Sequence, residues 1–325
     1  MGKLTFFKVF FDKFKKRFPD LEKSLPNVRG KLLFNEPLAK KNWFGVGGMA
    51  QIYFEPADMD DLRSFIKQTK GVPLTVLGAG SNVLIRDGGI PGITLRLGKA
   101  FSSIDVTNDT LICKGAALVM EVSRVAEKNA ISGFEFLCGI PGTVGGGIRM
   151  NAGAYGSSVH EILESLTVLT KEGDVQVLSK EELTDAFSYR RCHLPTEWIF
   201  LEAVFRGKKE KDSLVIQQKM MTNKQKREAG QPIGVRTAGS TFKNPDGIPA
   251  WQLIEKAGMK NAKVGGACVS SKHANFLINT GKATAKDIEE LGELIRKKVL
   301  EKEGVSLEWE VRKLGVEEER NKRDR

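Results

Sequence analysis

The 325-residue sequence lacks any long apolar run. No stretch approaches the roughly 18 to 20 apolar residues that a membrane span needs. Lysines recur through the N-terminal region, where a secretory signal would require an unbroken apolar stretch and a small-residue cleavage site. We therefore expect no transmembrane segment and no cleavable signal, which favours a cytoplasmic protein.

Cysteine and histidine are also scarce and scattered. Zinc and iron–sulfur sites need ligands that cluster, and no C-x-x-C spacing is present. We expect no metal site, and we expect the cysteines to be reduced residues of a packed interior. The residues concerned are Cys113, Cys138, Cys192, Cys268, His160, His193 and His273.

The formal charge of +11 raises the question of a nucleic-acid partner. Much of it is local, since lysines and Arg17 outweigh Asp12 near the N-terminus. No basic stripe interleaved with aromatics and no helix-turn-helix, zinc-finger or RNP pattern is present. Attraction of a small anionic substrate explains the charge equally well. We expect no nucleic-acid partner, and a basic nucleic-acid-binding protein remains the alternative from another class.

Residues 4–18 place phenylalanines along one stripe of a predicted helix, with lysines opposite. This helix could pack on the body of the protein, or rest weakly on an anionic membrane surface. We assign residues 1–29 to this N-terminal helix and residues 316–325 to a charged tail.

From Ala50 onward the pattern predicts alternating strands and helices, with a helix N-capped near Asp58. The composition becomes strongly charged after residue 207, so we place a domain boundary near 208. Further expected elements are a helix at 118–129, a hairpin at 166–179, a strand at 199–207, a charged helix ending at 230–232, helices near 250–257 and at 284–301, and a strand over 307–314.

One glycine-containing stretch, "VLGAGSNVLIRD" at 76–87, resembles a nucleotide-binding turn only in part. The dinucleotide fingerprint needs a third glycine at position 83 and a helix that begins there, but the chain has Val83 and continues as an apolar run. What remains is a turn whose backbone N–H groups around Gly78 to Asn82 are free to face an anion.

A second stretch, "GIPGTVGGGIRMNAGAYG" at 139–156, contains seven glycines in eighteen positions. A long helix or strand does not tolerate that density. We expect a compact loop with at most a short helix inside it, in which glycine removes bulk next to some other group.

Four polar segments are candidates for chemistry: "FSYRRCH", "RTAGSTFKNP", "SSKHANFLIN" and "LEWEVR". The first places Arg190 between a predicted helix and a strand. In the last, Glu308 and Glu310 share one face of a predicted strand and Trp309 takes the other. Each segment also has a purely structural interpretation as a turn, cap or solvent-facing strand. No G-x-S-x-G elbow surrounds Ser240, so a hydrolase nucleophile has little support.

Taken in order and spacing, eight motifs closely resemble the UDP-N-acetylenolpyruvoylglucosamine reductases of bacterial cell-wall synthesis, over about residues 30–315. They are "NWFGVGG", "VLGAGSNVLIRDGG", "GIPGTVGGGIRMNAGAYG", "FSYR", "AGSTFKNP", "AWQLIEKAG", "VSSKHANFLINTG" and "LEWEVR". A different flavin enzyme of the same fold, such as an oxidase, is the nearest competitor, but it does not predict the C-terminal motifs.

The resemblance implies an α+β fold. A two-part FAD-binding domain of the vanillyl-alcohol-oxidase/PCMH type would occupy 30–207, with subdomains at about 30–98 and 99–207, and an α+β substrate domain would occupy 208–315. Non-covalent FAD would lie between the two glycine stretches. The implied cofactor-binding residues are Gly78, Ala79, Gly80, Ser81, Asn82, Gly139, Ile140, Pro141, Gly142, Thr143, Gly145 and Gly146.

The activity implied by the resemblance is reduction of UDP-N-acetylglucosamine enolpyruvate to UDP-N-acetylmuramate. NADPH would reduce FAD, and hydride would then pass to the enolpyruvyl β-carbon. By family likeness Ser240 is the proton donor, and Arg190 and Glu310 steady the intermediate. The L-x-x-E-V pattern selects Glu310 over Glu308. Tyr189, Lys243 and Asn244 are the implied substrate contacts, although strand spacing puts Lys243 on the opposite side from Ser240.

The sequence also departs from the family pattern. No tyrosine lies between Arg190 and Ser240, so the chain resembles the branch that lacks a tyrosine-bearing substrate loop. How the substrate diphosphate is held is then left open. Cys138 stands where arginine is expected and Gly147 where alanine is common, so FAD affinity could differ.

Overall fold

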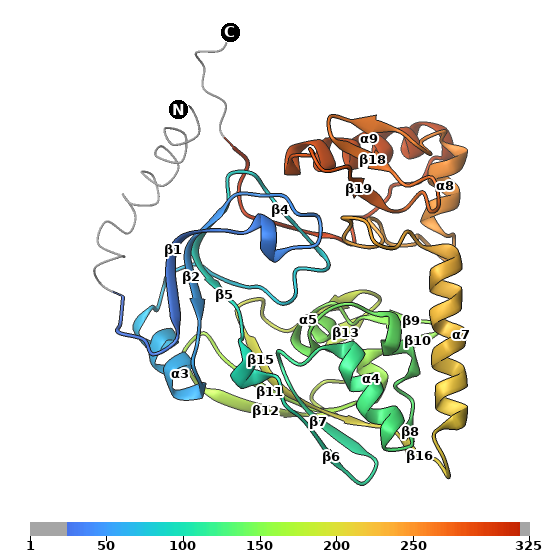
Figure 1. Ribbon diagram of the computed structural model, residues 1–325. Coiled ribbons are helices and arrows are strands. Elements are labelled where there is room, and N and C mark those ends of the chain that lie inside the picture. Colours follow the sequence, from blue (N-terminus) through green and yellow to red (C-terminus); the bar gives the residue numbers. More distant parts are fainter. Residues whose placement is uncertain (1–24, 319–325) are drawn as a thin grey trace.

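The computed structural model describes residues 25–318, and these form three packed units (Figure 1). The predicted N-terminal helix lies almost wholly outside the described residues, as does most of the predicted charged tail. Among the helices of residues 25–318, none combines the length and the apolar character that crossing a membrane requires.

The first unit is a four-stranded sheet with the order β1-β2-β5-β3. β1 is antiparallel to β2, and the other neighbours are parallel. Helix α3 (Met59–Gln68) covers one face, and its start is confirmed because the Asp58 side chain accepts the Asp61 N–H. Phe65 stacks on Phe54 of the sheet with ring centroids 4.0 Å apart. The strands are Lys31–Pro37, Met49–Glu55, Ile90–Leu95 and Leu74–Val76.

The second unit is a five-stranded antiparallel sheet with the order β12-β11-β15-β7-β6. The predicted hairpin and the strand that follows it are confirmed as β11, β12 and β15. The predicted short helix within the second glycine stretch is α5. The elements are Val175–Ser179, Leu163–Leu169, Ile199–Arg206, Thr110–Lys114 and Ile104–Thr107 for the strands, with α4 (Val119–Lys128) and α5 (Val144–Arg149).

Shorter elements connect these two units. The helical ones are η1 (Ala39–Lys41), η2 (Lys99–Phe101), η3 (Glu135–Gly139) and α6 (Val159–Ile162). The extended ones are β8 (Ile131–Ser132), β9 (Gly153–Ala154), β10 (Ser157–Ser158), β13 (Phe187–Ser188), β14 (Arg191–Cys192) and β16 (Lys208–Lys209).

The long helix α7 (Leu214–Gly230) runs along the side of the second unit toward the third (Figure 1). In the third unit, α8 (Ala250–Lys256) and α9 (Ala285–Glu303) share an apolar core with a small sheet of β17, β18 and β19. Thr284 and Asp287 form a capping box, which confirms the predicted start of α9. The three strands are Lys263–Val264, Ala267–Val269 and Leu277–Asn279.

The C-terminal segment returns to the first unit, where β20 (Arg312–Leu314) pairs in parallel with β4 (Val83–Ile85). The strand predicted over 307–314 is therefore wrong in its first half, in which Trp309 makes only an isolated bridge to Phe242. The Trp309 indole packs against α9 and donates to Glu293 Oε1 at 2.7 Å, and this packing sets the path of the chain. The C-terminal segment thus belongs in part to the first unit. The expected domain limits at 30–207 and 208–315 stay predictions.

Candidate active site

A cleft of about 1920 Å³ lies where the three units meet. Its walls come from both glycine stretches, from α4 and α7, and from the segments around Ser240 and Glu310. Pockets for one drug-sized ligand typically span roughly 300 to 1,000 Å³. The cleft therefore has room for a large cofactor together with a second ligand.

The first glycine stretch forms a turn that projects into this cleft. Within residues 25–318, no backbone N–H from Gly78 to Asn82 donates to another protein group. Gly80 has φ +69°, and a Cβ there would collide with the Lys41 carbonyl and lie 2.7 Å from Asn42 Cα. The turn is also tied back by the Trp43 N–H, which donates to the Gly80 carbonyl at 3.0 Å. A row of open amides on a fixed turn suits an anion.

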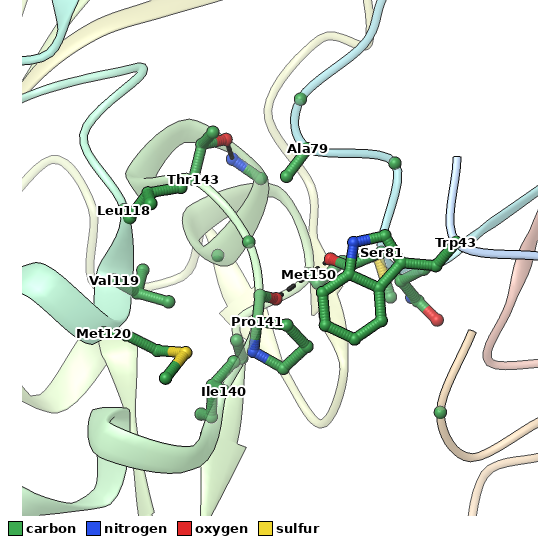
Figure 2. Close-up of a pocket in the computed structure, with 18 of the residues that line it drawn as sticks. Trp43, Ala79, Ser81, Leu118, Val119, Met120, Ile140, Pro141, Thr143 and Met150 are labelled. Atoms are coloured by element: carbon green, nitrogen blue, oxygen red, sulfur yellow. Dashed lines mark hydrogen bonds between the residues drawn. The ribbon is translucent and has the colours of Figure 1, made fainter. Parts of the chain in front are cut away.

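The second glycine stretch lies directly against this turn (Figure 2). The Ser81 hydroxyl donates to the Pro141 carbonyl at 2.9 Å, and Thr143 caps α5 by accepting the Gly146 N–H at 3.3 Å. A Cβ on Gly78 would lie only 2.8 Å from Thr143 Oγ1. The two stretches can approach this closely because glycine occupies position 78.

Both features fit a flavin dinucleotide. The open amide N–H groups can donate hydrogen bonds to a diphosphate, and no side chain of the glycines obstructs its approach. Beside them the cleft has an apolar wall, drawn in Figure 2, which suits the faces of aromatic rings. That wall includes Leu118, Val119, Met120, Ile140 and Met150.

Arg190 also lines the cleft and occupies the turn between β13 and β14, with φ +55°. The prediction that it follows a helix is wrong, because residues 187 and 188 form a strand that pairs with β14. Arg190 Nε donates to Glu310 Oε1 at 3.0 Å, and Nη2 donates to the Gly153 carbonyl at 2.8 Å. The arginine therefore joins the second glycine stretch to the C-terminal segment.

Glu310 is held in this pair with little exposure to water, since its side chain is 15% exposed. Burial raises the pKa of the Glu310 carboxyl, and the Arg190 cation opposes that shift. The Glu310 N–H donates to the Thr241 carbonyl at 2.8 Å, and the Asn82 side chain donates to the Glu310 carbonyl at 3.2 Å. The ion pair is thus anchored to the first glycine turn as well.

The chain resembles known proteins over most of its length. Residues 50–179 match the FAD binding domain model, and residues 231–314 match the model of the UDP-N-acetylenolpyruvoylglucosamine reductase C-terminal domain. The reductase of that name from Paramagnetospirillum magneticum is 48% identical over 91% of this chain and 96% of its own length, and that from Parvibaculum lavamentivorans is 46% identical over 91% and 95%.

A solved structure agrees with these relatives. The crystal structure of the Thermus caldophilus reductase (MurB) has a TM-score of 0.76 at 33% identity, and the match covers 89% of this chain and 100% of that one. The chain belongs to the UDP-N-acetylenolpyruvoylglucosamine reductase family. The expected α+β fold with a PCMH-type FAD-binding domain is confirmed, as is FAD as cofactor.

This reductase is therefore a FAD-containing oxidoreductase that reduces the enolpyruvyl group of UDP-N-acetylglucosamine enolpyruvate in peptidoglycan synthesis, with a nicotinamide nucleotide as its reductant.

Most site residues predicted from the sequence line the same cleft. All of the implied FAD-binding residues line the cleft, and so do Ser240, Arg190 and Glu310. Ser240 follows Gly239, which has φ +82°, and bridges to Phe276.

The three implied substrate contacts are not among the residues that line the cleft. Lys243 Nζ pairs with Glu308 Oε1 at 2.7 Å. Asn244 Oδ1 accepts the Ala250 N–H at 2.9 Å at the start of α8. Tyr189 is 53% exposed beside the Arg190 guanidinium. Their role in binding stays a prediction.

Sequence reasoning missed several other lining residues. Trp43 lies within "NWFGVGG", one of the motifs that carry the family resemblance, so this motif could have indicated it as a site residue. Met120 and Arg227 lie on helices whose sequences look like ordinary packed or solvated faces. Thr237 lines the cleft with a buried hydroxyl that has no hydrogen-bond partner within residues 25–318.

Proposed function

We propose that this reductase takes its hydride from NADPH, that Ser240 and Arg190 act directly on the enolpyruvyl substrate, and that Glu310 positions Arg190. The observation that carries this proposal is the partly buried Arg190–Glu310 pair in the cleft that Ser240 and both glycine stretches also line. Three separated segments converge there on one space.

Bound FAD supplies hydride transfer at this site. The open amides from Gly78 to Asn82 would hold its diphosphate, and the stretch from Gly139 to Gly146 would form the opposite wall. Hydride addition at the β-carbon leaves negative charge at the α-carbon and its carboxylate.

The part of the cleft lined by Arg190, Ser240 and Glu310, called the reacting end below, would stabilise that charge. The Arg190 guanidinium would stabilise the developing enolate, which is the task of a preorganised cation in a site shielded from water. Glu310 would hold the guanidinium in place through its 3.0 Å contact. The Ser240 hydroxyl would donate a proton to the α-carbon, aided by the nearby positive charge that stabilises its alkoxide.

The proposal has further parts. Tyr189, Lys243 and Asn244 would contact substrate once it is bound. A cytoplasmic location is supported by four cysteines that are all free thiols. The absence of a nucleic-acid partner, and weak membrane-surface contact by residues 4–18, which lie outside the described part, also stay proposals.

An anaerobic experiment tests the function. The FAD-loaded protein is reduced with NADPH, UDP-N-acetylglucosamine enolpyruvate is added, and the flavin absorbance is followed. We expect the oxidised spectrum to return without oxygen. Flavin that stays reduced after substrate addition, or that NADPH does not reduce, would contradict the proposal.

A further inference from the structure

Arg227 lies in the last turn of α7, lines the cleft and is close to Gly139 of the second glycine stretch. Its Cδ and Nη1 lie 3.3 and 3.5 Å from the point that a Cβ on Gly139 would occupy. The Tyr155 hydroxyl lies 3.9 Å from the same point and donates to the Asn223 carbonyl of α7 at 2.7 Å. The Arg227 side chain therefore occupies the space that a side chain at position 139 would need.

The Arg227 guanidinium has no counter-ion there. Within residues 25–318 it forms no ion pair and no hydrogen bond, and the next acid along α7, Glu228, is 4.0 Å from Lys224. Burial raises the pKa of the Cys138 thiol and of Tyr155, and Arg227 opposes both shifts. Its charge thus acts on groups of the cleft wall.

Two other cations of the cleft are bound by protein groups. Arg190 is bound by Glu310 and the Gly153 carbonyl, and Arg149 donates to the carbonyls of Leu194, Pro195 and Trp198. The second glycine stretch connects Arg227 to the reacting end, because Gly153 and Tyr155 are only two positions apart. A ligand that reacts at Ser240 and extends along this stretch would meet a half-buried guanidinium with open donors.

We propose that Arg227 binds the diphosphate of a nucleotide ligand that occupies the cleft beside the flavin. A planar guanidinium with open donors recognises phosphate oxygens in a bidentate manner. Two ligands of the proposed function carry this group, the UDP-sugar substrate and the nicotinamide nucleotide. The inference rests on that function, and it gives this chain a diphosphate contact that needs no tyrosine-bearing loop.

The test compares Arg227→Gln and Arg227→Lys with a control, Lys226→Gln. Lys226 is exposed on the same turn and does not line the cleft. Each FAD-loaded protein is titrated with UDP and, separately, with 2′-phospho-ADP-ribose. We expect Arg227→Gln to weaken one of these probes roughly 10- to 100-fold. Arg227→Lys should restore part of the loss, and Lys226→Gln should match the wild type.

The probe that weakens identifies the source of the diphosphate. Loss of UDP binding assigns Arg227 to the UDP-sugar, and loss of 2′-phospho-ADP-ribose binding assigns it to the nicotinamide nucleotide. Unchanged affinity for both probes, or release of FAD by Arg227→Gln, would overturn the inference. Failure of the proposed function is a separate result, because then the wild-type protein itself would not bind UDP and substrate would not reoxidise its flavin.

Discussion

The two ends of the cleft are built from different parts of the polypeptide. The glycine end, residues 78–82 and 139–146, presents backbone amides and depends on the absence of side chains. The reacting end, formed by Arg190, Ser240 and Glu310, depends on a partly buried ion pair between residues 120 positions apart. One end is encoded by short local motifs, whereas the other exists only after the units have packed.

This difference teaches how the two ends should fail. A bulky group at the glycine end should prevent cofactor binding if, as proposed, the flavin diphosphate occupies that space. A change at the reacting end should leave the cofactor bound and impair a single chemical step. The predictions below separate these outcomes, beginning with the largest expected effect.

The largest effect is expected for Ser240→Ala. Loss of a positioned proton donor should slow flavin reoxidation by the enolpyruvyl substrate by about 10²- to 10⁴-fold. Flavin reduction by NADPH and FAD content should change little, because the hydroxyl acts only on the second substrate. Stopped-flow absorbance of each half-reaction measures both rates. Equal slowing of both half-reactions would show that Ser240 has another role.

The glycine end is tested by Gly80→Ala. Alanine at this position would have to adopt φ +69°, and its Cβ would collide with the backbone of Lys41 and Asn42. We therefore expect loss of bound FAD and a decrease in the free energy of unfolding of about 2–5 kcal/mol. Gly71→Ala is the matched control, since Gly71 has φ +82° but nothing within 4 Å of its Cβ position. It should cost about 1 kcal/mol and keep FAD. Similar FAD affinity in both variants would contradict the steric argument.

The ion pair of the reacting end is tested by Arg190→Met. The Glu310 pKa is already raised above 4.5 by burial, so its contribution to stability is present at low pH and is lost as pH rises. Without the opposing cation, the folded-state pKa rises further and the loss extends to higher pH. Between pH 5 and 8, urea unfolding should show an extra decrease on the order of 1–3 kcal/mol. The Arg190→Met, Glu310→Gln double variant should lack this extra decrease.

Much of the site could be predicted from the sequence because glycine carries its own signal. The absence of side chains at Gly78, Gly80 and Gly139 is visible in the letters, and the structure uses that absence directly. Arg190 and Glu310 were selected by family likeness, and their contact could not be derived from spacing. Strand parity gave no means to separate Glu310 from Glu308, but burial separates them, because the Glu308 side chain is 71% exposed.

The rest depends on packing that no local pattern reports. The segment before β20 was expected to be a strand, but the Trp309 indole fills the space above Gly292 of α9 and redirects the chain. Arg227 lies in a charged helix that looks solvent-facing in sequence, and only the position of α7 beside the cleft makes it a lining residue. Long-range contacts of this kind require the assembled units.

The smallest effect is expected at Asp87, where the first unit contacts the third. Its carboxylate accepts the Ala285 N–H at 3.0 Å and the Lys286 N–H at 2.9 Å, so a residue of the first unit caps α9 of the third. Asp87→Ala removes a capping acceptor and a favourable charge at a helix N-terminus, which should cost about 1–2 kcal/mol in urea unfolding.

Asp212→Ala is the matched control for this joint. Asp212 accepts the Leu214 N–H at 2.8 Å at the start of α7, but it lies only two residues away in sequence and is exposed. It should therefore cost less, and it should leave hydrogen exchange in the first turn of α9 unchanged, whereas Asp87→Ala should accelerate it. Equal protection of α9 in both variants would mean that the first unit does not hold the third through Asp87. The pairing of β20 with β4 would then be the contact that returns the C-terminal segment to the first unit.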